Sequence, residues 1–158
     1  MQQESNLQGM TLGSWTLEVW RDHRRGQPLT GHSAAMARSL QHHKEWWTDW
    51  TGLEMKMVPE HDLLNRLIHV QNDAVIMLQL DSGQPGEVKT LFEALTEKGF
   101  NEFESIHTLA LAYMEEMAHA REHSETFDLV RYIERAGRFT KEALSRPNLA
   151  RAAKAKAY

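Results

Sequence analysis

The feature that most constrains this chain is the spacing of its apolar residues, which recur three, four and seven positions apart through most of the sequence. This spacing gathers them on one face of a helix with 3.6 residues per turn. A half-buried strand would instead need apolar and polar residues to alternate, and no run of the sequence does so convincingly. The spacing therefore predicts an all-α fold.

Turn and capping residues divide this pattern into about six helices. Asn101 followed by Glu104 has the form of a capping box and marks the start of a long helix, while Gly26 and Gly99 are expected helix stops. The second, third, fifth and sixth helices are the long ones, and we expect them to form the core of a single bundle. The expected spans are about 15–25, 30–50, 60–80, 85–99, 101–122 and 128–144.

A length of 158 residues suits one domain. We predict a mobile N-terminal segment over 1–13, a helical bundle domain over 14–145 and a basic tail over 146–158. The first residues lack the basic start and the apolar stretch of a signal peptide. No stretch approaches the 18 uncharged apolar residues that a membrane-spanning helix needs. We therefore expect a cytoplasmic protein with no membrane partner.

Charge is unevenly distributed although the net charge is only −4. Residues 60–128 contain fourteen acidic and four basic residues, whereas residues 129–158 contain two acidic and eight basic ones. Attraction between these two regions within one fold explains the division most simply. Binding of nucleic acid through the basic C-terminal third is a minor alternative.

The chain contains no cysteine, which excludes disulfides, thiolate metal sites and a cysteine nucleophile. Any metal must therefore be held by nitrogen and oxygen ligands. No Gly-x-Ser-x-Gly elbow and no glycine-rich phosphate loop are present. Two Glu-x-x-His motifs occur, but both fall on the helix predicted over 101–122, too far apart to share a pair of metals within a monomer.

Nine histidines are the main chemical signal. His69 lies in the middle of the most apolar helix, with Asp73 four residues later on the same face, so the pair suits either one bound ion or a buried hydrogen bond. His107 and Glu115 lie on the helix predicted over 101–122 and suit neighbouring positions along the bundle axis. Glu116 and His119, near the end of that helix, are interpreted as part of an exposed charged face.

Several motifs together resemble a small bacterial family, known only as the domain of unknown function number eighteen forty-one. The likeness runs from about Trp20 to Arg138 and needs almost no gaps after Asn65. The motifs that carry it are Arg24-Arg25-Gly26-Gln27-Pro28-Leu29, His43-Lys44-Glu45-Trp46-Trp47, Asn65-Arg66-Leu67-Ile68-His69, Gln79-Leu80, Gln84-Pro85, and His107 with Glu115.

The resemblance implies an all-α fold and supplies no activity. It places His69, His107 and Glu115 among the positions that members tend to share. The family often has histidine at position 73 and acids at 77 and 111, where this chain has Asp73, Met77 and Leu111. If the family binds metal, this chain either keeps a reduced site or has lost it. The reduced ligand set would be His43, His69, Asp73, His107 and Glu115.

Two functions follow as the main alternatives, and neither assigns a catalytic residue. The first is a non-catalytic interaction or accessory protein, with a protein partner or a second copy of the chain, in which buried histidines and carboxylates fix the helix register. The second is a metal-binding protein or metalloenzyme with Zn, Fe or Mn held between helices by nitrogen and oxygen ligands. The sequence does not decide whether the chain is an enzyme.

Overall fold

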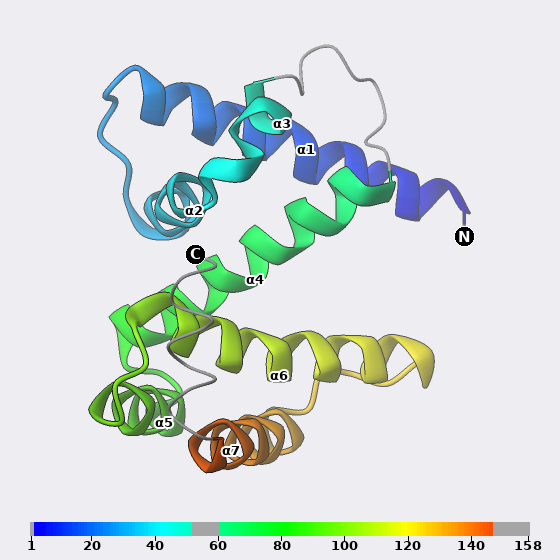
Figure 1. Cartoon of the computed structure of the whole chain (residues 1–158). Coiled ribbons are helices and arrows are strands. Elements are labelled where there is room, and N and C mark those ends of the chain that lie inside the picture. Colours follow the sequence, from blue (N-terminus) through cyan, green and yellow to red (C-terminus); the bar gives the residue numbers. More distant parts are fainter. Residues whose placement is uncertain (1, 52–60, 147–158) are drawn as a thin grey trace. The chain divides into compact units, whose positions relative to one another are not determined.

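The structure, a computed structural model, describes residues 2–51 and 61–146, and within them no strand occurs (Figure 1). The all-α prediction is confirmed, with seven α-helices in the described ranges against about six predicted. None of the described helices has the length and apolar character needed to cross a membrane. The elements are α1 (Gln2–Arg24), α2 (Gly31–His42), the 3-10 helix η1 (Lys44–Trp46), α3 (Trp47–Thr51), α4 (His61–Ser82), α5 (Gly86–Glu97), α6 (Glu102–Glu122) and α7 (Leu129–Ser145).

The chain divides into two compact units, Met1–Leu78 and Gln79–Tyr158, and α4 begins in the first and ends in the second. Each unit contains fully buried apolar side chains. In the first these include Trp20, Met36, Leu40, Trp50 and Leu67, and in the second Val88, Leu95, Ile106, Leu109 and Tyr132. The single bundle domain over 14–145 stays a prediction.

The first helix starts much earlier than its capping signal indicated. α1 begins at Gln2, so Ser14 lies inside the helix and residues 2–13, predicted as mobile, are helical. A capping residue favours a helix start without forbidding helix upstream, and Gln, Glu, Leu and Met before Ser14 are good helix formers, whereas Gly9 and Gly13 in the same segment are poor ones. The predicted stop is confirmed, because α1 ends at Arg24 and Gly26 has φ +71°. Residues 147–158 of the predicted basic tail lie outside the described residues.

The prediction of one helix over 30–50 is wrong, because the chain breaks at His43. α2 ends at His42, His43 adopts φ −85° and ψ 65°, and η1 and α3 follow. The indole Nε1 of Trp47 donates to the carbonyl oxygen of Leu40 at 3.1 Å, so a side chain satisfies one of the carbonyls at the helix end. Apolar spacing continues across the break, and for this reason the sequence pattern did not reveal it.

Helix ends in the second unit follow the sequence closely. The capping box is confirmed: Asn101 Oδ1 accepts from the Glu104 amide at 2.9 Å, and the Asn101 amide donates to Glu104 Oε2 at 2.8 Å. Pro85 is the residue that precedes α5, and Asp128 caps α7 by accepting from the Arg131 amide at 3.0 Å.

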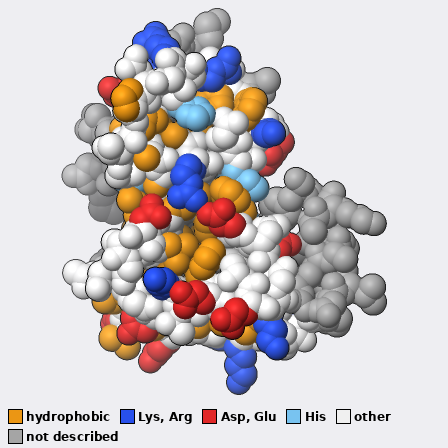
Figure 2. All heavy atoms as spheres, turned by 90° about the vertical axis from the view of Figure 1, so that its left-hand side faces the viewer, with side chains coloured by type: hydrophobic (Ala, Val, Ile, Leu, Met, Phe, Trp, Pro, Cys, Tyr) orange, Lys and Arg blue, Asp and Glu red, His pale blue; other side chains and the backbone are white. Residues whose placement is uncertain are grey.

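On the face in Figure 2, acidic and basic side chains are interspersed, with hydrophobic side chains visible between them.

A buried carboxylate joins α6 to α7. Glu116 is fully buried, so its assignment to an exposed face was wrong. Arg131 binds it through two hydrogen bonds of 2.8 and 2.9 Å, and Arg135 adds one of 3.2 Å. The Asp128 amide donates a further bond of 3.0 Å. The hydrogen bonds from Arg131 lower the pKa of Glu116 to about 2, against the opposing effect of burial.

We expect Glu116→Gln to destabilise the protein by about 3 kcal/mol, because it removes one charge of a buried, hydrogen-bonded ion pair. The free energy of unfolding, measured by urea denaturation at neutral pH, tests this. Glu115→Gln is the matched control, since Glu115 also pairs with Arg135 but is exposed and should cost less than about 1 kcal/mol. Equal effects of the two substitutions would contradict the assignment.

The stabilisation by Glu116 should also depend on pH. Because the folded state lowers the pKa of Glu116 from 4.5 to about 2, its stabilising effect is complete above about pH 4.5 and is lost as the pH falls towards 2. The stability difference between wild type and Glu116→Gln should therefore shrink over this acid range. A difference that stays constant down to pH 2 would contradict the low pKa.

Candidate functional site

A buried carboxylate on α4 forms the base of the candidate site in the first unit. Asp73 is fully buried, and His69 lies one helical turn before it on the same face. The His69 Nε2 atom is 3.4 Å from Asp73 Oδ2. The side chain of His69 remains 36% exposed, but its Nε2 atom is buried, so the exposure belongs to other atoms of that side chain.

The break after α2 brings a second imidazole to the same carboxylate oxygen. His43 is 3% exposed, and its Nε2 atom lies 3.3 Å from Asp73 Oδ2. The hydroxyl of Ser39 fixes α2 to α4 by donating to the Val70 carbonyl at 2.9 Å, one turn before the break. Two imidazoles therefore converge on one oxygen atom from elements about 30 residues apart in sequence.

An aromatic layer holds the His43 ring. The indole of Trp46 stacks on it with ring centroids 4.5 Å apart and an interplanar angle of 13°. The same indole meets His69 edge-on at 5.4 Å. The guanidinium of Arg66 lies over the Trp46 ring, 5.6 Å from its centroid, and also pairs with Asp49. This packing restricts rotation of both imidazoles.

Glu45 fixes the orientation of His43 from the opposite side. Its Oε1 atom is 3.0 Å from His43 Nδ1, and because a carboxylate only accepts, Nδ1 must carry the proton. Burial lowers the pKa of His43, but its hydrogen bonds to Asp73 and Glu45 outweigh this and raise the pKa overall. Burial raises the pKa of Glu45, while hydrogen bonds, including that to His43, lower it overall.

The separations around Asp73 match the spacing of metal ligands. Neutral hydrogen bonds between nitrogen and oxygen are usually shorter than the 3.3 and 3.4 Å found here. Two atoms each about 2.1 Å from a tetrahedral ion lie about 3.4 Å apart. The ligand atoms that His43, His69 and Asp73 offer all lie within 4.8 Å of one another. The three side chains can thus hold one ion with little movement.

The remaining two residues of the predicted ligand set belong to the second unit. His107 is half-buried on α6, with its ring 6.4 Å from that of Phe103. Glu115 is exposed, and its Oε2 atom binds Arg135 and Arg138 on α7 at 2.8 and 2.9 Å. Any contribution of His107 and Glu115 to the site stays a prediction.

Sequence reasoning missed the parts that Glu45 and Trp46 play. On a continuous helix, Glu45 would lie about 200° around the axis from His43, which places it on another face. The break after α2 turns it back towards the imidazole. The sequence signal was the run His43-Lys44-Glu45-Trp46-Trp47, which contains every side chain of this shell except those from α4 and Asp49.

Comparison with known proteins identifies the family and nothing more specific. A family model described as a domain of unknown function, DUF1841, matches residues 11–138. The chain therefore belongs to this family, as its motifs indicated. No curated protein and no solved structure matches it.

We expect the pKa of His43 in metal-free protein to lie above 6.5 and to fall in Glu45→Gln, because that variant loses an anionic acceptor. NMR titration of the histidine ring signals measures both values. Since the folded pKa is raised, the stabilisation by protonated His43 should be complete below pH 6.5 and disappear as the pH rises through the folded value. An unchanged pKa in Glu45→Gln would show that Glu45 does not act on the imidazole.

Proposed function

We propose that this member of the DUF1841 family binds one divalent transition-metal ion through His43 Nε2, His69 Nε2 and Asp73. The observation that carries the proposal is the convergence of both imidazole nitrogens on one buried carboxylate oxygen at 3.3 and 3.4 Å. In neutral form, each imidazole presents a lone pair there, and the carboxylate supplies negative charge.

The outer residues support the same proposal. A histidine that binds metal through Nε2 commonly donates its Nδ1 proton to a carboxylate, which fixes the ring and makes it a better ligand. Glu45 stands in that position relative to His43, at 3.0 Å. The indole of Trp46, stacked on the His43 ring, holds that ring against rotation.

Two imidazoles and one carboxylate suit Zn, Fe or Mn, and the absence of thiolates disfavours a soft ion. Three protein ligands leave at least one coordination position for water or another ligand. Metal-assisted catalysis would require such a position, and the reaction itself is not specified by the residues present.

The second candidate function is the metal-free network of an accessory or interaction protein. One observation favours it specifically: His43 lies between two carboxylates, so an imidazolium would satisfy both with its two N–H groups. In that form the network fixes α2 against α4 and performs no chemistry. The partner would then be a protein or a second copy of this chain.

Metal titration separates the two functions. We expect chelator-treated protein to bind one Zn²⁺, measured by isothermal titration calorimetry and elemental analysis. His43→Ala, His69→Ala and Asp73→Asn should each weaken binding by about 100-fold or more, because each removes a ligand or its charge. His23→Ala, which alters a histidine outside the cluster, should bind as the wild type does.

Thermal unfolding supplies the second readout. Saturating Zn²⁺ should raise the melting temperature of wild type but not of Asp73→Asn. If no variant differs from wild type in metal affinity, the metal proposal fails. The buried network is the correct function if the wild type binds no metal and His69→Ala lowers the free energy of unfolding of the metal-free protein by about 1 to 3 kcal/mol.

His107→Ala and Glu115→Ala test the two predicted ligands of the second unit. If His107 completes the site, its removal should weaken Zn²⁺ binding by about 10-fold or more, whereas a three-ligand site leaves the affinity unchanged. For Glu115, already bound by two arginines, we expect no change in affinity. A loss in Glu115→Ala with normal stability would return this residue to the ligand set.

A further inference from the structure

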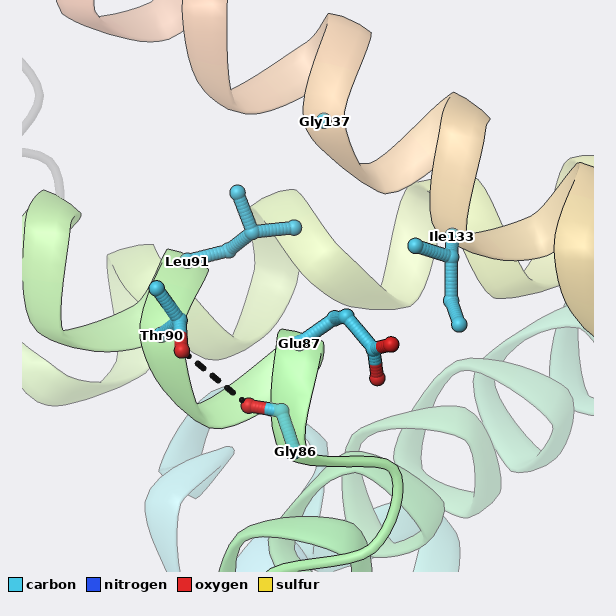
Figure 3. Close-up of a pocket in the computed structure, with 6 residues that line it drawn as sticks. All are labelled: Gly86, Glu87, Thr90, Leu91, Ile133 and Gly137. Carbon is cyan, nitrogen blue, oxygen red and sulfur yellow. Dashed lines mark hydrogen bonds between the residues drawn. The ribbon is translucent and has the colours of Figure 1, made fainter.

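A cavity of about 590 Å³, broadly open to the surface, lies between α5 and α7 in the second unit. None of the metal-site residues lines it. Figure 3 shows the side chains of Leu91 and Ile133 extending into the space between the two helices. The volume is within the usual range for sites that hold small organic molecules. The lining residues are Gly86, Glu87, Thr90, Leu91, Ile133 and Gly137.

Gly137 lines one wall of this cavity without a side chain. Glycine is, after proline, the residue that most weakens a helix interior, yet Gly137 lies well inside α7. Its φ is not positive, and a Cβ placed on it would meet no atom of residues 2–51 and 61–146 within 4 Å. Neither the backbone nor close packing therefore requires glycine here. What the missing side chain does is keep the space beside Ile133 and Leu91 empty.

Among the described residues that line the cavity, Glu87 is the only acidic one. Its carboxylate extends beside Ile133 in Figure 3. It lies in the first turn of α5, where the partial positive charge of the helix N-terminus attracts a negative side chain. Within the described part of the chain, no ion pair to Glu87 is found. The hydroxyl of Thr90 is already used, because it donates to the Gly86 carbonyl at 3.3 Å.

We propose that this cavity binds a small molecule with a hydrocarbon body and one protonated amine. The apolar walls, to which the glycine backbone adds no bulk, accept the hydrocarbon, and the unpaired carboxylate at the edge accepts the ammonium. An anionic head would meet repulsion from Glu87, and a neutral head would lack the attraction between opposite charges. This site is independent of the metal proposal and goes beyond it.

The test uses the full-length ¹⁵N-labelled protein and three eight-carbon probes with different head groups: n-octylammonium, octan-1-ol and octanoate. We expect n-octylammonium to shift the amide signals of Gly86, Thr90 and Gly137 in a saturable manner. Its affinity should exceed that of octan-1-ol by about fivefold, as suits a partly exposed ion pair, and octanoate should bind most weakly.

Variants separate the charge from the cavity. Glu87→Gln should reduce the affinity for n-octylammonium to that for octan-1-ol, whereas Glu93→Gln, an exposed acid elsewhere on α5, should change nothing. Gly137→Leu should weaken binding of all three probes by about tenfold or more by filling the space. Gly137→Ala should raise the melting temperature by about 3 °C, which shows that the helix itself does not need glycine.

Three outcomes would overturn the proposal. Shifts that are absent, or scattered over both units, would show that the cavity is not a binding site. Equal affinity for the ammonium and the alcohol in wild type would exclude recognition by charge. Unchanged binding in a folded Gly137→Leu protein, with folding checked by its melting temperature, would place the probe elsewhere.

Discussion

The burial of a carboxylate is the constraint on which each unit of this protein depends. Asp73 in the first unit and Glu116 in the second are both fully buried. A buried charge is tolerated only when it is paired and its oxygens accept hydrogen bonds. The elements around each carboxylate are therefore fixed by the need to supply partners: α2 and α4 around Asp73, and α6 and α7 around Glu116.

The two carboxylates differ in the chemistry of their partners. Glu116 is bound by guanidinium groups, which remain charged at every accessible pH and form a permanent connection. Asp73 faces imidazoles, which exchange a proton near neutral pH and bind metal when they lose it. A chain can stabilise its fold with the first arrangement, whereas the second can change state when the pH or the metal supply changes.

The cavity between α5 and α7 follows from a different property, the omission of a side chain. Packing normally fills the space between helices, because voids forfeit dispersion contacts. Here Gly137 leaves the wall open and Glu87 lies at the edge without an ion pair among the described residues. The second unit therefore contains both the cavity, whose described lining is apolar apart from Glu87 and Thr90, and the ion pairs of Glu116 with Arg131 and Arg135.

The sequence by itself determined the helical class, most of the helix ends in the second unit and the family. Apolar spacing and capping side chains act over one or two turns, and for this reason the capping box at Asn101 and the stop at Gly26 could be read directly. It also singled out His69 with Asp73, because residues four apart share a helix face. Only the tertiary structure decided that the chain breaks at His43, that Glu45 turns back to its imidazole, and that Glu116 is buried. These facts depend on which residues meet across elements distant in sequence. A local pattern of residue types does not specify which distant residue a side chain will contact.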